Sequence, residues 1–253
     1  KVLYSRTIAP VICATLKKTF KENPEHIRDN RTMPDALEPF SPATQQWFRN
    51  AFGTPTAAQE GAWESISKGE NALIIAPTGS GKTLAAFLWA LDALYRDKSV
   101  EPDQRELTTS AQARKNGDAR ETQKTKKQRA GGTRILYVSP LKALGADVER
   151  NLRAPLAGIA HTAKESGRTP PDITVGIRSG DTPARERRQL ISNPPDILLT
   201  TPESLYLMLT SAARSTLTGV TTVIVDEVHA LAGTKRGAHL AVSLERLDQL
   251  VER

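Results

Sequence analysis

The chain has 253 residues, of which 38% are hydrophobic, and this is enough to bury the core of one large α/β domain or two small ones. A wholly disordered chain is therefore excluded. No stretch reaches the roughly 18 consecutive apolar residues of a membrane span. The single cysteine, Cys13, cannot form an internal disulfide or a cysteine-based metal site, and we expect a soluble, cytoplasmic protein that contacts no membrane.

The formal net charge of +7 is concentrated in two segments. Residues 1–32 carry seven Lys/Arg against three Asp/Glu, residues 96–132 carry ten against six, and the rest of the chain carries 18 against 19. We expect residues 1–32 to be an extension of uncertain order. Residues 96–132 contain almost no large apolar side chain, so they cannot offset their ordering entropy, and we predict a disordered charged insertion. An argument for nucleic-acid binding must therefore rest on motifs and not on total charge.

Short apolar runs alternate with longer, mostly amphipathic helical patterns in the remaining chain. The predicted strands are residues 72–75, 135–138, 173–177, 197–199 and 223–225. The predicted helices are residues 83–95, 141–160, 183–191, 204–213 and 237–251. Because the strands are continuously apolar and helices follow them, the pattern predicts an α/β domain with a mostly parallel sheet sandwiched between helices.

Each predicted strand is followed at once by a polar or Gly/Pro-rich segment. The five segments are APTGSGKT from residue 76, SPLKAL from 139, RSGDT from 178, TTPES from 200 and DEVH from 226. In open parallel sheets, ligands bind beyond the carboxyl ends of the strands. We therefore expect all five segments to meet at one edge of the sheet.

The first of these segments has the features of a phosphate-binding loop, because it follows a strand and opens a helix. Gly79 and Gly81 let backbone amides curl around the β-phosphate without a Cβ clash, and the helix N-terminus adds its positive dipole end. Lys82 would neutralise the β- and γ-phosphates, and the hydroxyl of Thr83 would bind Mg²⁺. The alternative is a glycine-rich turn with a solvated lysine. The candidate phosphate-binding residues are Thr78, Gly79, Ser80, Gly81, Lys82 and Thr83.

The predicted strand that ends at residue 225 delivers two acids, Asp226 and Glu227. In a site that hydrolyses nucleoside triphosphates, such a pair divides the work. Asp226 would hold Mg²⁺ directly or through water, and Glu227 would polarise the attacking water. Two acids at a helix N-terminus are the alternative, and the phosphate loop upstream favours the hydrolysis site. Lys82, Asp226 and Glu227 are thus the candidate catalytic residues, with Thr83 and Asp226 as metal ligands.

The order of these segments, with Gln59 in PTAAQ ahead of them, resembles the first motor domain of superfamily 2 helicases of the DEAD/DEAH-box kind. More narrowly, stretches such as APTGSGKTLAAFLWALDAL, YVSPLKALGADVERNLRAPL and VIVDEVHALAGTKRGAHLAVSLERLDQL are similar to the Lhr, or large helicase-related, proteins. The resemblance covers residues 33–95 and 133–253. It implies that residues 33–253 form a RecA-like P-loop domain that binds ATP and Mg²⁺.

The resemblance assigns further roles around the nucleotide. Gln59 is similar to the glutamine that reads adenine, and its amide can donate and accept at once; a helix-surface glutamine is the alternative. Phe40 corresponds by spacing to an aromatic that stacks on the base, while Phe48 and Phe52 compete for that role and core packing is equally open. His229 closes the DEVH segment, where such helicases link the nucleotide site to the opposing motor domain.

The resemblance also implies contacts with single-stranded DNA or RNA, in which hydroxyls, amides and helix N-termini grip phosphates without reading bases. For Lys142 and Thr201, a solvated or capping role is equally open. The implied contacts are Ser139, Pro140 and Lys142 in a first motif, Thr201, Pro202 and Glu203 in a second, and Arg178, Gly180 and Asp181 in the loop between them.

The sequence departs from the helicase pattern at its end. Helicases of this type have a Ser-Ala-Thr motif after the DEVH box and then a second RecA-like domain with arginines that reach the γ-phosphate, and neither occurs before Arg253. Such an arginine is worth roughly 10³ to 10⁵ in rate. We therefore expect the isolated chain to bind ATP, to hydrolyse it weakly or not at all, and not to unwind nucleic acid alone.

The sequence thus predicts the ATP-binding domain of an Lhr-type helicase or translocase. Two other classes stay open. One is a P-loop ATPase that remodels proteins, against which Gln59 and the SPLKAL and TPES segments argue. The other is a catalytically silent module that holds nucleotide or strand.

Overall fold

A computed structural model describes residues 2–5, 35–77, 79–99 and 132–251 of the chain. The strands are β1 (Val2–Ser5), β2 (Ala72–Leu73), β3 (Ile135–Val138), β4 (Val175–Arg178), β5 (Ile197–Thr200) and β6 (Thr222–Val225). The helices are α1 (Pro42–Phe52), α2 (Ala57–Ser67), α3 (Lys82–Ser99), α6 (Lys142–Glu165), α7 (Ala184–Ser192), α8 (Pro202–Leu209), the 3₁₀ helix η1 (Ala212–Leu217), α9 (Val228–Leu231) and α10 (Lys235–Val251). Within these ranges, no helix is long and apolar enough to cross a membrane.

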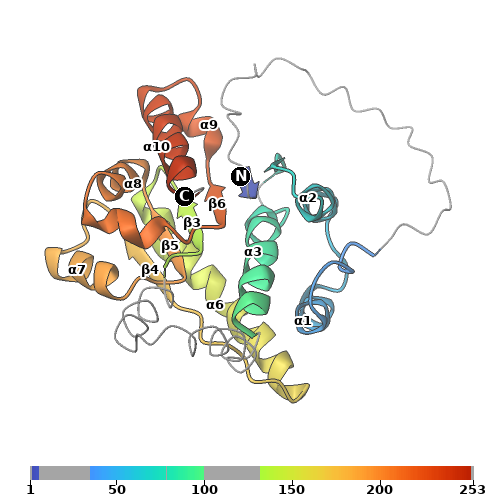
Figure 1. The fold of residues 1–253 in the computed structure, drawn as a ribbon. Helices are drawn as coiled ribbons and strands as arrows, with labels where there is room; N and C mark the ends of the chain where they lie inside the picture. Colours follow the sequence, from blue (N-terminus) through green and yellow to red (C-terminus); the bar gives the residue numbers. More distant parts are fainter. Residues whose placement is uncertain (1, 6–34, 78, 100–131, 252–253) are drawn as a thin grey trace, which may run out of the picture.

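The strands form one sheet in the order β2-β1-β6-β3-β5-β4 (Figure 1). The strands β6, β3, β5 and β4 pair in parallel, whereas β1 is antiparallel to both of its neighbours, β2 and β6. It follows that β2 runs in the same direction as the parallel strands. The prediction of a mostly parallel sheet between helices is confirmed.

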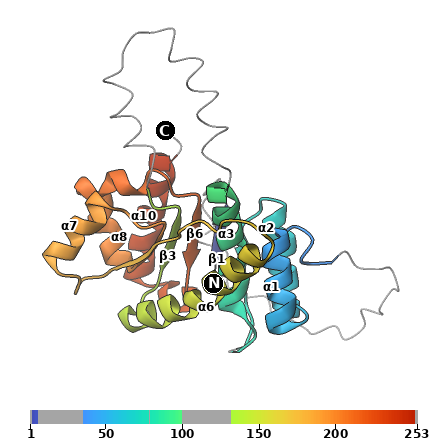
Figure 2. The same ribbon diagram turned by 90° about the horizontal axis from the view of Figure 1, so that it is seen from below.

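The strand β3 shows why this sheet is covered on both faces. All four of its residues are buried, and successive side chains of a strand point to opposite faces. Ile135 and Tyr137 join a core cluster with residues of α1, α2, α3 and α6, and Leu136 and Val138 join a second cluster with residues of α8 and α10. The two groups of helices lie on opposite sides of the sheet in Figures 1 and 2.

An aromatic cluster fixes α2 beside α3, the helix that the phosphate loop opens. The ring of Trp63 packs edge-on against Phe40 at 4.8 Å and against Phe48 at 5.5 Å between centroids. The indole N–H of Trp63 also donates to the carbonyl of Ala85 at 3.0 Å. Because edge-to-face rings and a buried hydrogen bond fix both distance and orientation, Gln59 on α2 is held at a constant place relative to the loop.

The predicted insertion begins later than expected. Residues 96–99 form the last turn of α3 instead of disordered chain, and Lys98 Nζ donates to the carboxylate of the buried Asp196 at 2.8 Å. Residues 100–131 of the predicted insertion lie outside the described residues, and its last residue, Gly132, is described. Within the predicted N-terminal extension, residues 2–5 form β1 inside the sheet, and residues 6–34 lie outside the described part.

Candidate nucleotide and nucleic-acid site

The phosphate loop and the acid pair lie at the same edge of the sheet. The loop follows β2, and Asp226 follows β6, and these two strands run in the same direction with only β1 between them. Neighbouring strands are about 4.8 Å apart, so the two strand ends are about 10 Å apart. Figure 2 shows β1 between β6 and α3. The phosphate loop and the acid pair therefore flank the same end of β1.

The loop after β2 has the backbone of an anion cradle. Gly79 and Gly81 have φ values of 85° and 80°, a region that side chains disfavour, and a Cβ on Gly79 would meet nothing within 4 Å. Lys82 is the first residue of α3, and its ammonium donates to the carbonyls of Ala76 at 2.5 Å and Pro77 at 2.6 Å. The ammonium therefore lies within the loop at the helix N-terminus, and phosphate binding by this loop stays a prediction.

Three further loop residues were expected to contact phosphate. Ser80 donates its hydroxyl to the carbonyl of Pro77 at 2.8 Å, and Thr83 is the second residue of α3. Thr78 lies outside the described residues. The described part of the loop therefore has the strand, turn and helix order that the sequence predicts.

Gln59 joins α2 to this loop. It forms a capping box with Thr56, in which its side-chain oxygen accepts from the backbone N–H of Thr56 at 2.9 Å. The hydroxyl of Thr56 donates to the carbonyl of Ser80 at 3.0 Å, and a Cβ on Gly81 would lie 2.6 Å from the amide nitrogen of Gln59. Gln59 is only 4% exposed, so the alternative of a helix-surface glutamine is wrong.

The acid pair follows the end of β6, and two hydrogen bonds hold the carboxylate of Asp226. Asp226 is buried, accepts from the hydroxyl of Tyr137, and accepts from the backbone N–H of Glu227 at 2.9 Å. Burial, and then the neighbouring Asp226 carboxylate, raise the pKa of Tyr137 well above its usual range, so Tyr137 stays a donor. Glu227 has φ 49° and ψ 41° and is the one non-glycine residue with positive φ in the described ranges. Its carboxylate lies 3.3 Å from His229 Nε2.

The strained backbone of Glu227 places the two carboxylates differently. A left-handed residue costs roughly 1–2 kcal/mol, and such conformations gather at functional sites. Asp226 is buried against β3, while Glu227 is half-buried beside the exposed His229. Mg²⁺ prefers oxygen ligands, so the carboxylate of Asp226 and the hydroxyl of Thr83 are each of a suitable chemical type for the predicted magnesium site. Glu227 is the more exposed of the two acids and lies beside His229.

Tyr137 was not among the candidates from the sequence, and its substitution gives a test. We expect Tyr137→Phe to raise the Mg²⁺ concentration needed for half-maximal binding of an ATP analogue by about tenfold, because residues that orient a metal ligand are worth 10- to 100-fold in metal affinity. Analogue binding without Mg²⁺ should not change. Titration of Mg²⁺ into chain and fluorescent analogue measures this, with Tyr206→Phe on α8 as the matched control. An unchanged midpoint of the Mg²⁺ titration would show that Asp226 does not bind the metal.

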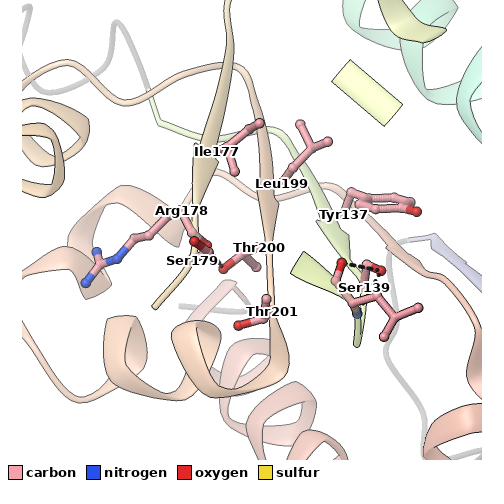
Figure 3. A pocket seen from close by; sticks show the side chains of 9 residues that line it. Tyr137, Ser139, Ile177, Arg178, Ser179, Leu199, Thr200 and Thr201 are labelled. Carbon is pink, nitrogen blue, oxygen red and sulfur yellow. Dashed lines mark hydrogen bonds between the residues drawn. The ribbon is translucent and has the colours of Figure 1, made fainter. Parts of the chain in front are cut away.

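The segments after β3 and β5 lie side by side at the sheet edge, as Figure 3 shows. Ser139 is 2% exposed, and its hydroxyl accepts from the backbone N–H of Leu141 at 3.3 Å. Thr201 is 5% exposed and caps α8 by accepting from the N–H of Ser204 at 3.4 Å. Pro202 is buried as the first residue of α8, and Lys142 is the first residue of α6. The hydroxyl of Thr201 therefore caps α8, whereas that of Ser139 holds the turn before α6, a helix with no side-chain cap.

Arg178 lines the same pocket as Ser139 and Thr201, but its side chain does not point toward them. Its guanidinium points away from Ser139 and Tyr137 in Figure 3, and the residue is buried at 8% exposure. Within the described residues its Nη1 atom has no hydrogen-bond partner. Burial lowers its pKa, and the charge of Arg187 lowers it further. The contact between Arg178 and a nucleic-acid strand stays a prediction.

The loop that follows Arg178 is held by Arg187 of α7. Its Nε donates to the carbonyl of Thr182 at 2.7 Å, and its Nη2 donates to the carbonyl of Gly180 at 2.6 Å. Gly180 and Asp181 are both exposed. These two residues, and not Arg178, present this loop to solvent.

The aromatic residues considered for base stacking lie mainly in the core. Phe40 is 3% exposed and Phe48 is fully buried, so core packing, the alternative for both, is what the structure has. Phe52 is 55% exposed at the end of α1 and packs against Trp47 with ring centroids 5.7 Å apart.

The fold and the loop together define a RecA-like P-loop domain. The family description DEAD/DEAH box helicase matches residues 56–253. The chain belongs to the DEAD/DEAH box helicase family.

Relatives place the chain within that family. It is 59% identical over 218 residues to the Lhr helicase/probable uracil glycosylase of Mycolicibacterium smegmatis and 57% identical over 220 residues to the Lhr helicase/uracil glycosylase of Escherichia coli. These matches cover 86% of this chain but only 13% of each relative, so the chain spans about one eighth of their length. The resemblance to Lhr proteins is confirmed.

A solved structure supports the same placement. The chain matches the structure of Mycobacterium smegmatis helicase Lhr bound to ssDNA and AMP-PNP with a TM-score of 0.70 and 58% identity, over 85% of this chain and 24% of that one. The DEAD-box helicase Mss116, at 16% identity and a TM-score of 0.56, shares the fold.

Proposed function

We propose that this chain is the first motor domain of an ATP-dependent DNA helicase or translocase. Mg·ATP would bind between the loop at Lys82 and the acids Asp226 and Glu227, with Gln59 beside the base. Single-stranded DNA would cross the starts of α6 and α8. The carrying observation is that both candidate sites follow strands that run in the same direction in one sheet, so both lie at the same edge.

The proposed chemistry divides among the chain's own residues. Lys82 and the loop amides would bind the phosphates, and Thr83 and Asp226 would hold the ion that neutralises their charge. Glu227 would accept a proton from the attacking water. His229, whose Nε2 lies 3.3 Å from the Glu227 carboxylate, would link the protonation of that carboxylate to contacts with a facing domain. Rapid hydrolysis and unwinding would need a second RecA-like domain that supplies an arginine to the γ-phosphate.

The choice of DNA over RNA is supported by the single-stranded DNA bound in the 58% identical Lhr structure. Backbone amides at helix N-termini bind phosphates of either polymer, so the local geometry alone does not separate them. A module that binds nucleotide but no strand, or an ATPase that acts on proteins, would lack strand binding altogether.

We expect the chain to bind a fluorescent oligo-dT strand, more tightly with Mg·AMP-PNP than without nucleotide. The affinity should fall with salt, with a log–log slope of about −0.7 for each phosphate neutralised. Fluorescence anisotropy at several salt concentrations measures both, with oligo-rU as the comparison strand. Tighter binding of oligo-rU would overturn the DNA assignment, and absence of binding to both strands would overturn the motor proposal.

A further inference from the structure

The helix α10 begins with two cations, which works against its local stability. Lys235 and Arg236 form the start of the helix, and its first turn contains no acid. The N-terminus of a helix carries the positive end of the dipole, so cations there are unfavourable. Residues that break a local rule without a local gain point to a contact or a role elsewhere.

Arg236 makes two contacts, each with one of the segments proposed to hold a strand. Its Nε donates to Glu203 Oε1 at 2.7 Å, in the first turn of α8. Its Nη2 donates to the carbonyl of Pro140 at 3.1 Å, in the segment between β3 and α6. One guanidinium therefore joins three segments that are far apart in the sequence. The hydrogen bond and charge of Arg236 also hold the pKa of Glu203 below its usual range.

These contacts contribute little to the stability of the fold. The side chains of Arg236 and Glu203 are 49% and 53% exposed. Ion pairs as exposed as this one are worth about 0–1 kcal/mol. Arg236 therefore fixes the relative positions of the three segments more than it stabilises the fold. Its planar guanidinium presents two N–H groups in a constant relative direction.

The position of Glu203 gives the pair an electrostatic role. A carboxylate in the first turn of α8 stabilises the helix but repels any phosphodiester that approaches the same amides. Arg236 neutralises this carboxylate and holds it toward α10. Without Arg236, the start of α8 would present a negative charge to the strand.

We propose that Arg236 is a positioning residue for nucleic-acid binding, which holds the segment at Pro140 and the start of α8 in fixed relation and screens Glu203 from the phosphates. This inference rests on the proposed function.

The test compares two arginines of the same helix in the whole chain. We expect Arg236→Ala to weaken oligo-dT binding about fivefold, which corresponds to the upper end of the range for an exposed ion pair, and Arg236→Lys to recover part of the loss. Arg246→Ala removes an exposed charge further along α10 and should weaken binding less than twofold. Anisotropy gives the affinity for oligo-dT, calorimetry with Mg·AMP-PNP gives the nucleotide affinity, and all three variants should keep the nucleotide affinity of the wild type.

The outcomes separate this inference from the motor proposal. If the wild-type chain binds no oligo-dT, both the motor proposal and the role of Arg236 are overturned. Wild-type binding with equal losses in Arg236→Ala and Arg246→Ala overturns the role of Arg236 alone. A loss of nucleotide affinity equal to the loss of strand affinity in Arg236→Ala would also overturn it, because a positioning residue at the strand should not affect a site on β2.

Discussion

Lys82→Ala is expected to weaken binding of Mg·AMP-PNP about 30- to 100-fold. The ammonium donates to two carbonyls of its own loop and lies at the N-terminus of α3, where a bound phosphate would meet it. A charge-assisted hydrogen bond to a phosphate oxygen is worth about 2–3 kcal/mol, and each 1.4 kcal/mol is tenfold in affinity. Calorimetric titration of the chain with Mg·AMP-PNP measures the loss.

The control for this change is Lys68→Ala. Lys68 caps α2 and pairs with the exposed Glu64 at 2.8 Å, so its removal deletes the same charge without touching the loop. Its nucleotide affinity should match the wild type. Equal affinities for wild type and Lys82→Ala would place the nucleotide elsewhere and would remove the main support for an ATP-driven function.

The elements that the sequence predicted well are those fixed by local pattern. The strand at residues 135–138 has the predicted bounds, because four consecutive buried apolar residues leave no other reading. The predicted helix at 204–213 is instead two elements, since Thr201 caps α8 at an earlier residue and the helix ends at Leu209 before η1 begins. From the sequence alone, capping is only one of the roles open to Thr201, the other being contact with nucleic acid.

The elements that were missed depend on partners far away in the sequence. The strand β1 is stabilised by pairing with β6, about 220 residues later. The last turn of α3 looks like solvated chain until Lys98 meets Asp196. Local composition contains neither contact, so the sequence alone predicts disorder or uncertain order for both segments.

The site divides in the same way. The loop at Lys82 and the acid pair are short sequence patterns whose order along the chain fixes their place at the sheet edge. The direction of Arg178 depends on the parity of β4, which a shift of one residue reverses. Ile177 packs into the cluster of α3 and α6, so Arg178 points to the opposite face. Tyr137 had one visible signal, a hydroxyl in an otherwise aliphatic buried strand, which demands a partner.

Gly237→Ala is expected to destabilise the chain by about 2–3 kcal/mol, within the range for overpacked positions. A Cβ on Gly237 would lie 2.0 Å from the carbonyl oxygen of Leu231, and this is backbone that cannot rotate away. The hydroxyl of Thr234 donates to the same oxygen at 2.7 Å and accepts from the N–H of Gly237 at 3.0 Å, which fixes the turn between α9 and α10. The melting temperature should fall by about 5–10 °C.

The matched control is Gly61→Ala, which adds the same methyl group to another helical glycine. A Cβ there would meet nothing within 4 Å, and alanine is about 1 kcal/mol better than glycine in a helix, so the melting temperature should hold or rise. In Gly237→Ala the start of α10 must move, and Arg236 moves with it, so we also expect weaker oligo-dT binding at temperatures where the variant is folded. If Gly237→Ala had the same melting temperature as Gly61→Ala, α10 would not begin against Leu231. The contacts of Arg236 with Glu203 and Pro140 would then lose their structural basis.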